Sequence, residues 1–106
     1  MYYVKITDTA EDDILSCVKY IADVLNAPTA ANNLLDEIKK HEEILENTPG
    51  IFPCVPNEHL ASMGFRFTIV KNYLMFYSIN EDEKTVDVHR FLYGHRDWIN
   101  ILTESR

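Results

Sequence analysis

Residues 64–98 constrain the fold of this chain more than any other stretch, because they predict three consecutive strands. Residues 65–70 and 73–79 are rich in aromatic and β-branched side chains, which suit a pleated, half-buried surface. Lys71-Asn72 separates them, and asparagine tolerates the left-handed backbone that a tight hairpin needs. A polar turn then leads to residues 85–92, where apolar and polar side chains alternate. The stretch is therefore expected to form an antiparallel meander.

Two amphipathic helices precede this meander and can cover its apolar face. The first is expected to follow the capping residues 7–9 and to end near residue 26, and the second to run from Pro28 to about residue 47. Their apolar residues recur three and four positions apart, which predicts one buried stripe on each helix. The predicted stripes are Ala10, Ile14, Cys17, Val18, Ile21 and Leu25, then Ala31, Leu34, Leu35, Ile38, Ile44 and Leu45.

With a short strand at residues 2–6, the order of elements is β-α-α-β-β-β. This order predicts an α+β fold in which a helical hairpin packs on one face of a mainly antiparallel sheet. Residues 51–63 are expected to be a packed loop, and residues 99–102 a helical or strand-like tail. The length of 106 residues fits one domain, residues 1–106.

Charge is unevenly distributed along the chain. Residues 1–60 hold eleven acids and four lysines, and residues 61–106 hold six acids and six basic residues, so the first part accounts for the net charge of −7. An acidic protein is a poor general binder of nucleic acid. No membrane span or signal peptide is predicted, so we expect a cytoplasmic protein in which Cys17 and Cys54 are reduced thiols.

The sequence has no glycine-rich phosphate loop, no metal-ligand spacing and no nucleotide-binding fingerprint, so neither a metal nor a cofactor is predicted. Its chemistry is expected from polar residues on the strands and just after them. Alternation along the strand places Arg66 on the sheet face that the helices leave open. Arg90 is expected to share the side of Val86 and Val88, and to need a carboxylate from a helix or from Asp97.

The candidate site residues are therefore Arg66, Arg90, Tyr93, His95 and Arg96. Three roles remain open for them. Arginine with histidine or tyrosine can cleave RNA, by stabilising charge on phosphorus and moving a proton. The same residues can bind carboxylates of a partner protein. They can also form only structural ion pairs within the chain.

Three stretches resemble the RelE/ParE superfamily of type II toxin–antitoxin toxins: AEDDILSCVKYIADVLNAPTAANNLLDEIKK, GFRFTIVKNYLMFYSI and RFLYGHRDW. The last two are the more specific, and they are similar to the ParE-like, plasmid stabilization branch. The resemblance covers essentially the whole chain and implies the element order given above. It also implies a cognate antitoxin protein whose C-terminal segment wraps the toxin, with no membrane and no small-molecule cofactor involved.

The superfamily implies two possible targets. RelE-like members cut mRNA on the ribosome without a metal, as endoribonucleases, whereas ParE-like members are not nucleases and inhibit growth by acting on DNA gyrase. Arg66 and Arg96 match two basic positions of the nucleases, and His95 is a candidate acid or base. Three other expected positions carry side chains of another type: Thr68, Leu74 and Leu102. The resemblance thus favours gyrase, with mRNA cleavage or a non-toxic, antitoxin-binding member as alternatives.

Overall fold

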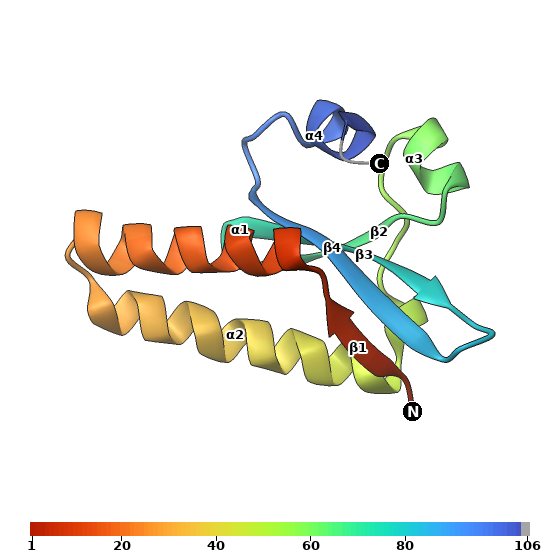
Figure 1. Cartoon of the computed structure of the whole chain (residues 1–106), viewed down its shortest axis with the longest axis horizontal. Helices are drawn as coiled ribbons and strands as arrows, with labels where there is room; N and C mark the ends of the chain where they lie inside the picture. Colours follow the sequence, from red (N-terminus) through yellow and green to blue (C-terminus); the bar gives the residue numbers. More distant parts are fainter. Residues whose placement is uncertain (105–106) are drawn as a thin grey trace.

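The computed structural model describes residues 1–104, and Figure 1 shows two long helices packed along a four-stranded sheet. The α+β fold expected from the sequence is confirmed. The helices are α1 (Asp8–Lys19), α2 (Pro28–Asn47), α3 (Glu58–Ser62) and α4 (Trp98–Glu104), with one π turn η1 (Tyr20–Val24) and one 3-10 turn η2 (Pro49–Ile51). The strands are β1 (Tyr3–Ile6), β2 (Arg66–Val70), β3 (Tyr73–Asn80) and β4 (Thr85–Tyr93).

The sheet has the order β1-β4-β3-β2. Strands β2, β3 and β4 form the expected antiparallel meander, and β1 pairs in parallel with β4. The helical hairpin carries the chain from β1 to the opposite edge of the sheet, where β2 begins the meander. After two antiparallel turns, β4 runs in the same direction as β1 and pairs with it. Lys71 rather than Asn72 adopts the left-handed backbone in the β2–β3 turn, with φ of 57°.

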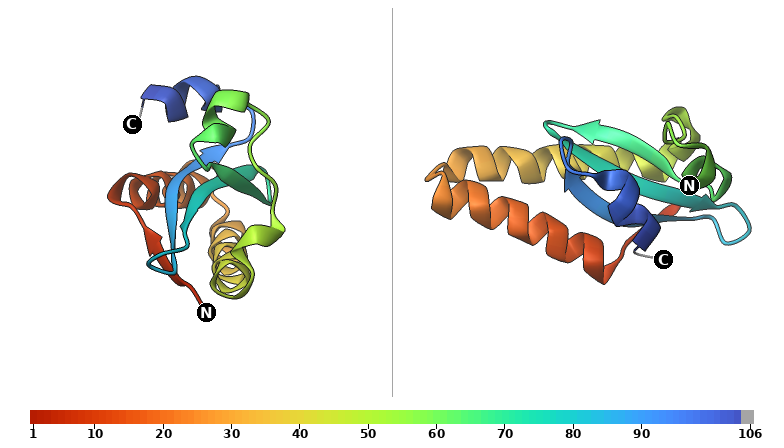
Figure 2. Two further views of the ribbon diagram at one scale, coloured as in Figure 1. Left: turned by 90° about the vertical axis from the view of Figure 1, so that its right-hand side faces the viewer. Right: turned by 90° about the horizontal axis from the view of Figure 1, so that it is seen from above.

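The helical hairpin is held by local signals at its ends. Thr7 caps α1 by accepting a hydrogen bond from the Ala10 backbone N–H at 3.1 Å, and acidic side chains follow in the first turn, where they favour the helix dipole. The turn η1 then closes the first helix, Asn26 takes a φ of 52°, and Pro28 begins α2. Figure 2 shows that α1 and α2 run side by side in opposite directions.

Both faces of the sheet are covered, whereas the sequence analysis expected cover on one. The larger core lies between the hairpin and the sheet, and includes Leu34, Ile38, Val70, Met75 and Tyr77. The smaller core lies on the other face, where Leu60 of α3 and Leu102 of α4 pack with Phe65, Phe76 and Leu92. The segment expected as a loop contains η2 and α3, and the tail is helical, which is why this second cover was missed.

Three residues of the predicted stripes are exposed: Leu25 by 56%, Leu35 by 40% and Ile44 by 37%. Leu25 lies beyond the π turn, where the periodicity of the α-helix no longer applies. Leu35 and Ile44 each adjoin a buried leucine, and a step of one residue turns a side chain by about 100° around a helix. None of the helices in residues 1–104 is long and apolar enough to cross a membrane.

Candidate partner-binding site

Arg90 lies on a different side of β4 from the one predicted, because the strand contains a bulge. The pairing with β3 shifts there, so that Val88 lies opposite Tyr77 and Arg90 opposite Phe76. The extra residue, His89, ends the simple alternation that placed Arg90 beside Val88. The Ser78 hydroxyl and His89 Nε2 are 2.7 Å apart on this second face.

The carboxylate partner expected for Arg90 is present, and it comes from helix α1. Arg90 Nε donates to Asp13 Oδ2 at 2.7 Å, and Arg90 Nη2 donates to Asp13 Oδ1 at 2.9 Å. Asp13 Oδ2 also accepts the backbone N–H of Phe91 at 3.0 Å, beyond the end of β1. The side-chain hydrogen bond to Asp13 raises the pKa of Arg90. Asp13 thus joins α1 to the edge of β4, and sequence reasoning had not singled it out.

Arg66 faces the helical hairpin, which corrects its expected position on an open face. Thr68, two residues along the strand, lies 2.8 Å from His41 Nδ1 of α2. The Arg66 Nη1 group donates to the carbonyls of Phe52 at 2.6 Å and Gly50 at 3.5 Å. Side chains alternate along β2 as predicted, but the two faces of the sheet were assigned the wrong way round. Phe65 packs into the smaller core, which the sequence did not reveal, so Arg66 points to the helical hairpin.

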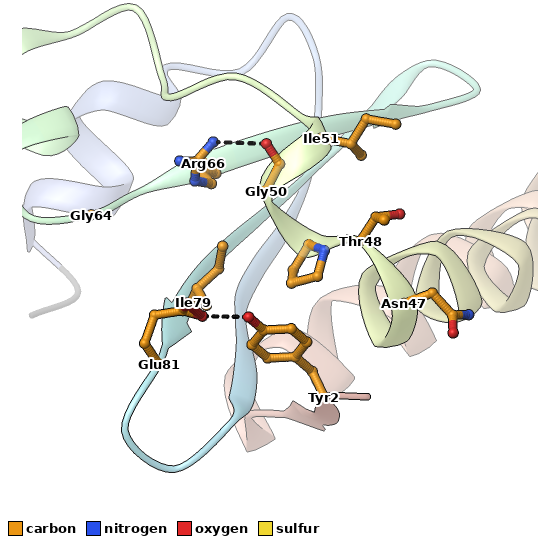
Figure 3. A pocket seen from close by; sticks show the side chains of 10 residues that line it. Tyr2, Asn47, Thr48, Gly50, Ile51, Gly64, Arg66, Ile79 and Glu81 are labelled. Atoms are coloured by element: carbon orange, nitrogen blue, oxygen red, sulfur yellow. Dashed lines mark hydrogen bonds between the residues drawn. The ribbon is translucent and has the colours of Figure 1, made fainter.

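Figure 3 shows Arg66 at one end of a hollow of about 680 Å³, which we call the Arg66 pocket. At its other end Glu81 accepts a hydrogen bond from the Tyr2 hydroxyl at 2.5 Å. The buried Tyr77 hydroxyl donates to the carbonyl of Pro49, which lines the pocket, at 2.6 Å, and burial raises the pKa of Tyr77 to about 12.

Tyr93 and Arg96 lie together at a second hollow of about 920 Å³, between the closed end of the helical hairpin and the β2–β3 turn. We call it the hairpin-end groove, and its lining includes Cys17, Tyr20, Leu25, Tyr73, Tyr93 and Arg96. Among the described residues that line it, the charged ones are Arg96 and Lys71. Tyr20 is 52% exposed and Tyr93 is 43% exposed, so the groove is apolar, open and positively charged at its rim.

Gly94 positions the segment that carries Arg96. Its N–H donates to the Asn72 carbonyl at 2.9 Å, and a Cβ atom at this position would lie 3.2 Å from the same oxygen. The Arg96 N–H then donates to the Tyr93 carbonyl at 3.0 Å and closes a turn. Only glycine permits so close an approach without a shift of the backbone. Gly94 therefore keeps the segment that carries Arg96 against the β2–β3 turn.

Burial changes the proton affinities of two groups beside this groove. It raises the pKa of the half-buried Cys17 thiol, an effect that Asp13 adds to and that a hydrogen bond from Tyr73 opposes. Burial likewise raises the pKa of Tyr73. Both groups are therefore neutral near pH 7, and they offer a partner polarity without charge.

His95 is exposed, with its ring 5.2 Å from that of Tyr93. Asp97 is also exposed and accepts a hydrogen bond from Asn100 at 2.6 Å at the start of α4. The next residue, Trp98, packs against Phe76 with 5.5 Å between ring centroids, and so anchors α4 to the smaller core.

Arg66 and the segment that carries Arg96 start from different positions along β3. Arg66 of β2 pairs with Tyr77 of β3, whereas Tyr93, three residues before Arg96, pairs with Tyr73 of β3. Four residues of strand separate these two positions, which corresponds to about 13 Å. The site residues therefore divide into Arg66 in its own pocket, Arg90 with Asp13, and Tyr93, His95 and Arg96 at the hairpin end.

Sequence reasoning missed Lys71, Tyr20 and Leu25 as parts of the groove. Leu25 was assigned to a buried stripe, although it lies at the end of a helix directly before Asn-Ala-Pro. An apolar residue at such a terminus need not point into the core, and that was the available signal.

Comparison with known proteins identifies the family. The sequence model of the family described as "ParE toxin of type II toxin-antitoxin system, parDE" matches residues 4–98. The chain belongs to the ParE toxin family. Curated proteins gave no significant match.

Solved structures share the fold. The chain is similar to one from the chromosomal ParDE TA system of P. aeruginosa, with a TM-score of 0.69, 18% identity, and coverage of 88% of this chain and 96% of that one. It is also similar to a chain of the toxin–antitoxin complex RelBE2 from Mycobacterium tuberculosis, with a TM-score of 0.58 and 16% identity, covering 87% of this chain and 96% of that one. A chain of the archaeal RelE–RelB complex from Pyrococcus horikoshii OT3 matches with a TM-score of 0.56 and 19% identity, covering 90% of this chain and 97% of that one.

Proposed function

We propose that this ParE-family protein inhibits growth by acting on DNA gyrase, and that an antitoxin neutralises it by docking in the hairpin-end groove. The family match to ParE supports the gyrase target, because the superfamily resemblance associates that branch with gyrase. An antitoxin partner is supported by the similar solved structures, one named a ParDE TA system and one a RelBE2 toxin–antitoxin complex.

The choice of gyrase over mRNA as the target rests on the separation of Arg66 from Arg96. Metal-free RNA cleavage needs an arginine and an acid or base within reach of one phosphate. Arg66 donates to two backbone carbonyls in the Arg66 pocket, while Arg96 lines the hairpin-end groove at the other end of β3. Such an arrangement favours protein binding over phosphodiester chemistry.

The hairpin-end groove fits an antitoxin segment that combines an apolar anchor with a carboxylate. Tyr20, Leu25 and Tyr93 offer exposed apolar surface, which a protein partner can cover. Arg96 at the rim can form two parallel hydrogen bonds with a carboxylate, and Lys71 adds a second positive charge. Because the rest of the chain is acidic, these cations would also orient an acidic segment as it approaches.

The docking part is tested by measuring antitoxin affinity for Arg96→Ala, Tyr93→Ala and Arg66→Ala. We expect Arg96→Ala to weaken binding at least about tenfold, since a charged hydrogen bond contributes about 1.5–3 kcal/mol. Lys5→Ala is the control, because Lys5 is exposed on β1, away from the groove, and should leave the affinity unchanged. Affinity within twofold of wild type for Arg96→Ala would refute docking in the hairpin-end groove, whatever the effect of Arg66→Ala, because Arg66 lies in its own pocket.

The target part is tested by inducing the chain without antitoxin and pulse-labelling DNA and protein synthesis in one culture. Early arrest of DNA synthesis, together with inhibition of gyrase supercoiling by the purified protein, is the expected result. If translation stops first and mRNA is cut within reading frames, the protein is an endoribonuclease and the gyrase proposal is wrong. Unchanged growth with retained antitoxin binding would identify a non-toxic member.

A further inference from the structure

A hollow of about 380 Å³ lies beside the smaller core, and we call it the Ser78 pocket. Its volume is within the range of about 300–1,000 Å³ that small-molecule sites occupy. It shares no lining residue with the Arg66 pocket or with the hairpin-end groove, so the proposed function leaves it unused. Its lining consists of three apolar and five polar residues: Met63, Phe65 and Leu102, then Thr7, Thr9, Ser78, His89 and Arg90.

A hydroxyl and an imidazole meet in the Ser78 pocket as a nucleophile and a base must. Ser78 Oγ and His89 Nε2 are 2.7 Å apart. When Nδ1 carries the ring proton, Nε2 accepts the hydroxyl proton of Ser78, which is the first requirement for general-base activation of a serine. Burial lowers the pKa of His89 despite the nearby Asp87, so the ring is neutral near pH 7 and able to take a proton.

The bulge in β4 gives His89 its position, and contacts from outside the strand hold it there. The register with β3 shifts at this point, so that His89 is the extra residue. The Thr7 hydroxyl donates to the His89 carbonyl at 3.2 Å, and the Phe65 ring meets the imidazole edge-on with 5.2 Å between ring centroids. Bulges often lie next to active sites, where they redirect a side chain. This one directs a base toward a serine.

The walls of the Ser78 pocket suit a small ester. Phe65 and Leu102 are buried and offer an apolar wall for a short acyl chain, while Met63 is 39% exposed at the surface. Among the described residues that line the pocket, Arg90 carries the charge, and its partner Asp13 is not part of the lining. A positive charge beside the serine favours the negative oxygen that forms when a carbonyl is attacked.

We propose that the Ser78 pocket hydrolyses small esters of short apolar acids, with Ser78 as nucleophile and His89 as general base. Ser78 Oγ bonds to the ester carbonyl carbon, and its proton passes to His89 Nε2. The bond from that carbon to the alcohol oxygen breaks, and this oxygen takes the proton from Nε2, leaving the acyl group on Ser78. Water then attacks the acyl carbon and gives a proton to Nε2. The Ser78 oxygen recovers that proton as the carboxylic acid leaves.

The first test uses an alkyl fluorophosphonate, because attack by a serine oxygen on phosphorus expels fluoride and leaves a stable ester. Peptide mass spectrometry of the labelled full chain should place the label on Ser78. Substitution His89→Gln should slow labelling at least about a hundredfold, since a general base contributes about 10²–10⁴-fold. Ser62 is the matched control within the same chain: its hydroxyl donates to the His59 carbonyl at 2.6 Å, not to an imidazole, and it should stay unlabelled.

The second test follows hydrolysis of p-nitrophenyl butyrate by the purified protein. Ser78→Ala should decrease the rate at least about tenfold, whereas Ser62→Ala should leave it unchanged, with circular dichroism confirming that both variants are folded. A label on residues other than Ser78 would overturn the proposal, and so would hydrolysis that survives Ser78→Ala. Equal labelling rates in wild type and a folded His89→Gln variant would show that His89 does not activate the serine.

Discussion

Substitution of Asp13 by asparagine is expected to destabilise this protein strongly without changing the size of the side chain. The Asp13 carboxylate accepts three hydrogen bonds, two from the Arg90 guanidinium and one from the backbone N–H of Phe91. An amide offers one acceptor atom, and its NH₂ group would face a donor. The substitution therefore removes the negative charge that faces Arg90 and replaces an acceptor oxygen by a group that donates.

The magnitude follows from the exposure of the pair. The side chains of Arg90 and Asp13 are 15% and 13% exposed, so the pair is mostly buried but keeps some contact with water. Breaking a buried ion pair costs about 3–5 kcal/mol, and partial exposure places this one near the lower end, at about 3 kcal/mol. For 106 residues, an unfolding entropy of about 0.22 kcal/mol/K converts that loss into a decrease in Tm of roughly 13 °C.

The assay is urea unfolding followed by circular dichroism, with the free energy of unfolding and its slope fitted for each variant. Asp12→Asn is the matched control, because Asp12 is the exposed neighbour on α1 and loses the same charge. Its expected effect is within about 0.5 kcal/mol of zero. If Asp13→Asn also fell within that range, the hydrogen-bonded pair would not be what joins α1 to β4.

Three further predictions concern buried groups. Tyr77→Phe should cost about 1–2 kcal/mol in urea unfolding, because it leaves a buried carbonyl without its donor, while Tyr3→Phe at an exposed position should be neutral. A thiol reagent at neutral pH should modify exposed Cys54 at least about tenfold faster than Cys17, whose pKa is raised by burial. Burial lowers the pKa of His89, so the unfolded chain binds a proton first and stability should decrease as the pH falls below about 6.5.

The His89 prediction is checked by measuring the unfolding free energy from pH 7 to pH 5. His89→Gln should reduce the loss of stability over this interval, since the glutamine side chain can still contact Ser78 but does not titrate. His59→Gln serves as the control because His59 is exposed on α3. An unchanged pH dependence in His89→Gln would contradict the assigned cause.

Local patterns in the sequence were enough to predict the main elements of the fold. Aromatic and β-branched runs gave β2, β3 and β4, and the capping residues with Pro28 gave α1 and α2, because these signals act within a few residues. A helical carboxylate was one of the two partners predicted for Arg90, the other being Asp97, since a half-buried guanidinium needs a partner.

The positions of the site side chains depended on features without a local signal. One extra residue at His89 moved Arg90 to the other side of its strand, and no sequence pattern marks a bulge of this kind. The short helices α3 and α4 hold five and seven residues, too few for a clear period, yet they cover the second face of the sheet. Without this second cover, the sequence predicted the wrong face of the sheet for Arg66.

The uneven charge along the chain places positive and negative side chains at different hollows of the helical hairpin. The hairpin-end groove has Lys71 and Arg96 at its rim, while a separate hollow between α1 and α2 is lined by three acids and one lysine. A net charge of −7 alone would repel every acidic segment. Screening in salt is effective beyond about 8–10 Å, so the nearest charges decide which segment the hairpin-end groove accepts. Binding of an acidic segment at the hairpin end should therefore depend on Arg96, whatever the charge of the acidic hollow between α1 and α2.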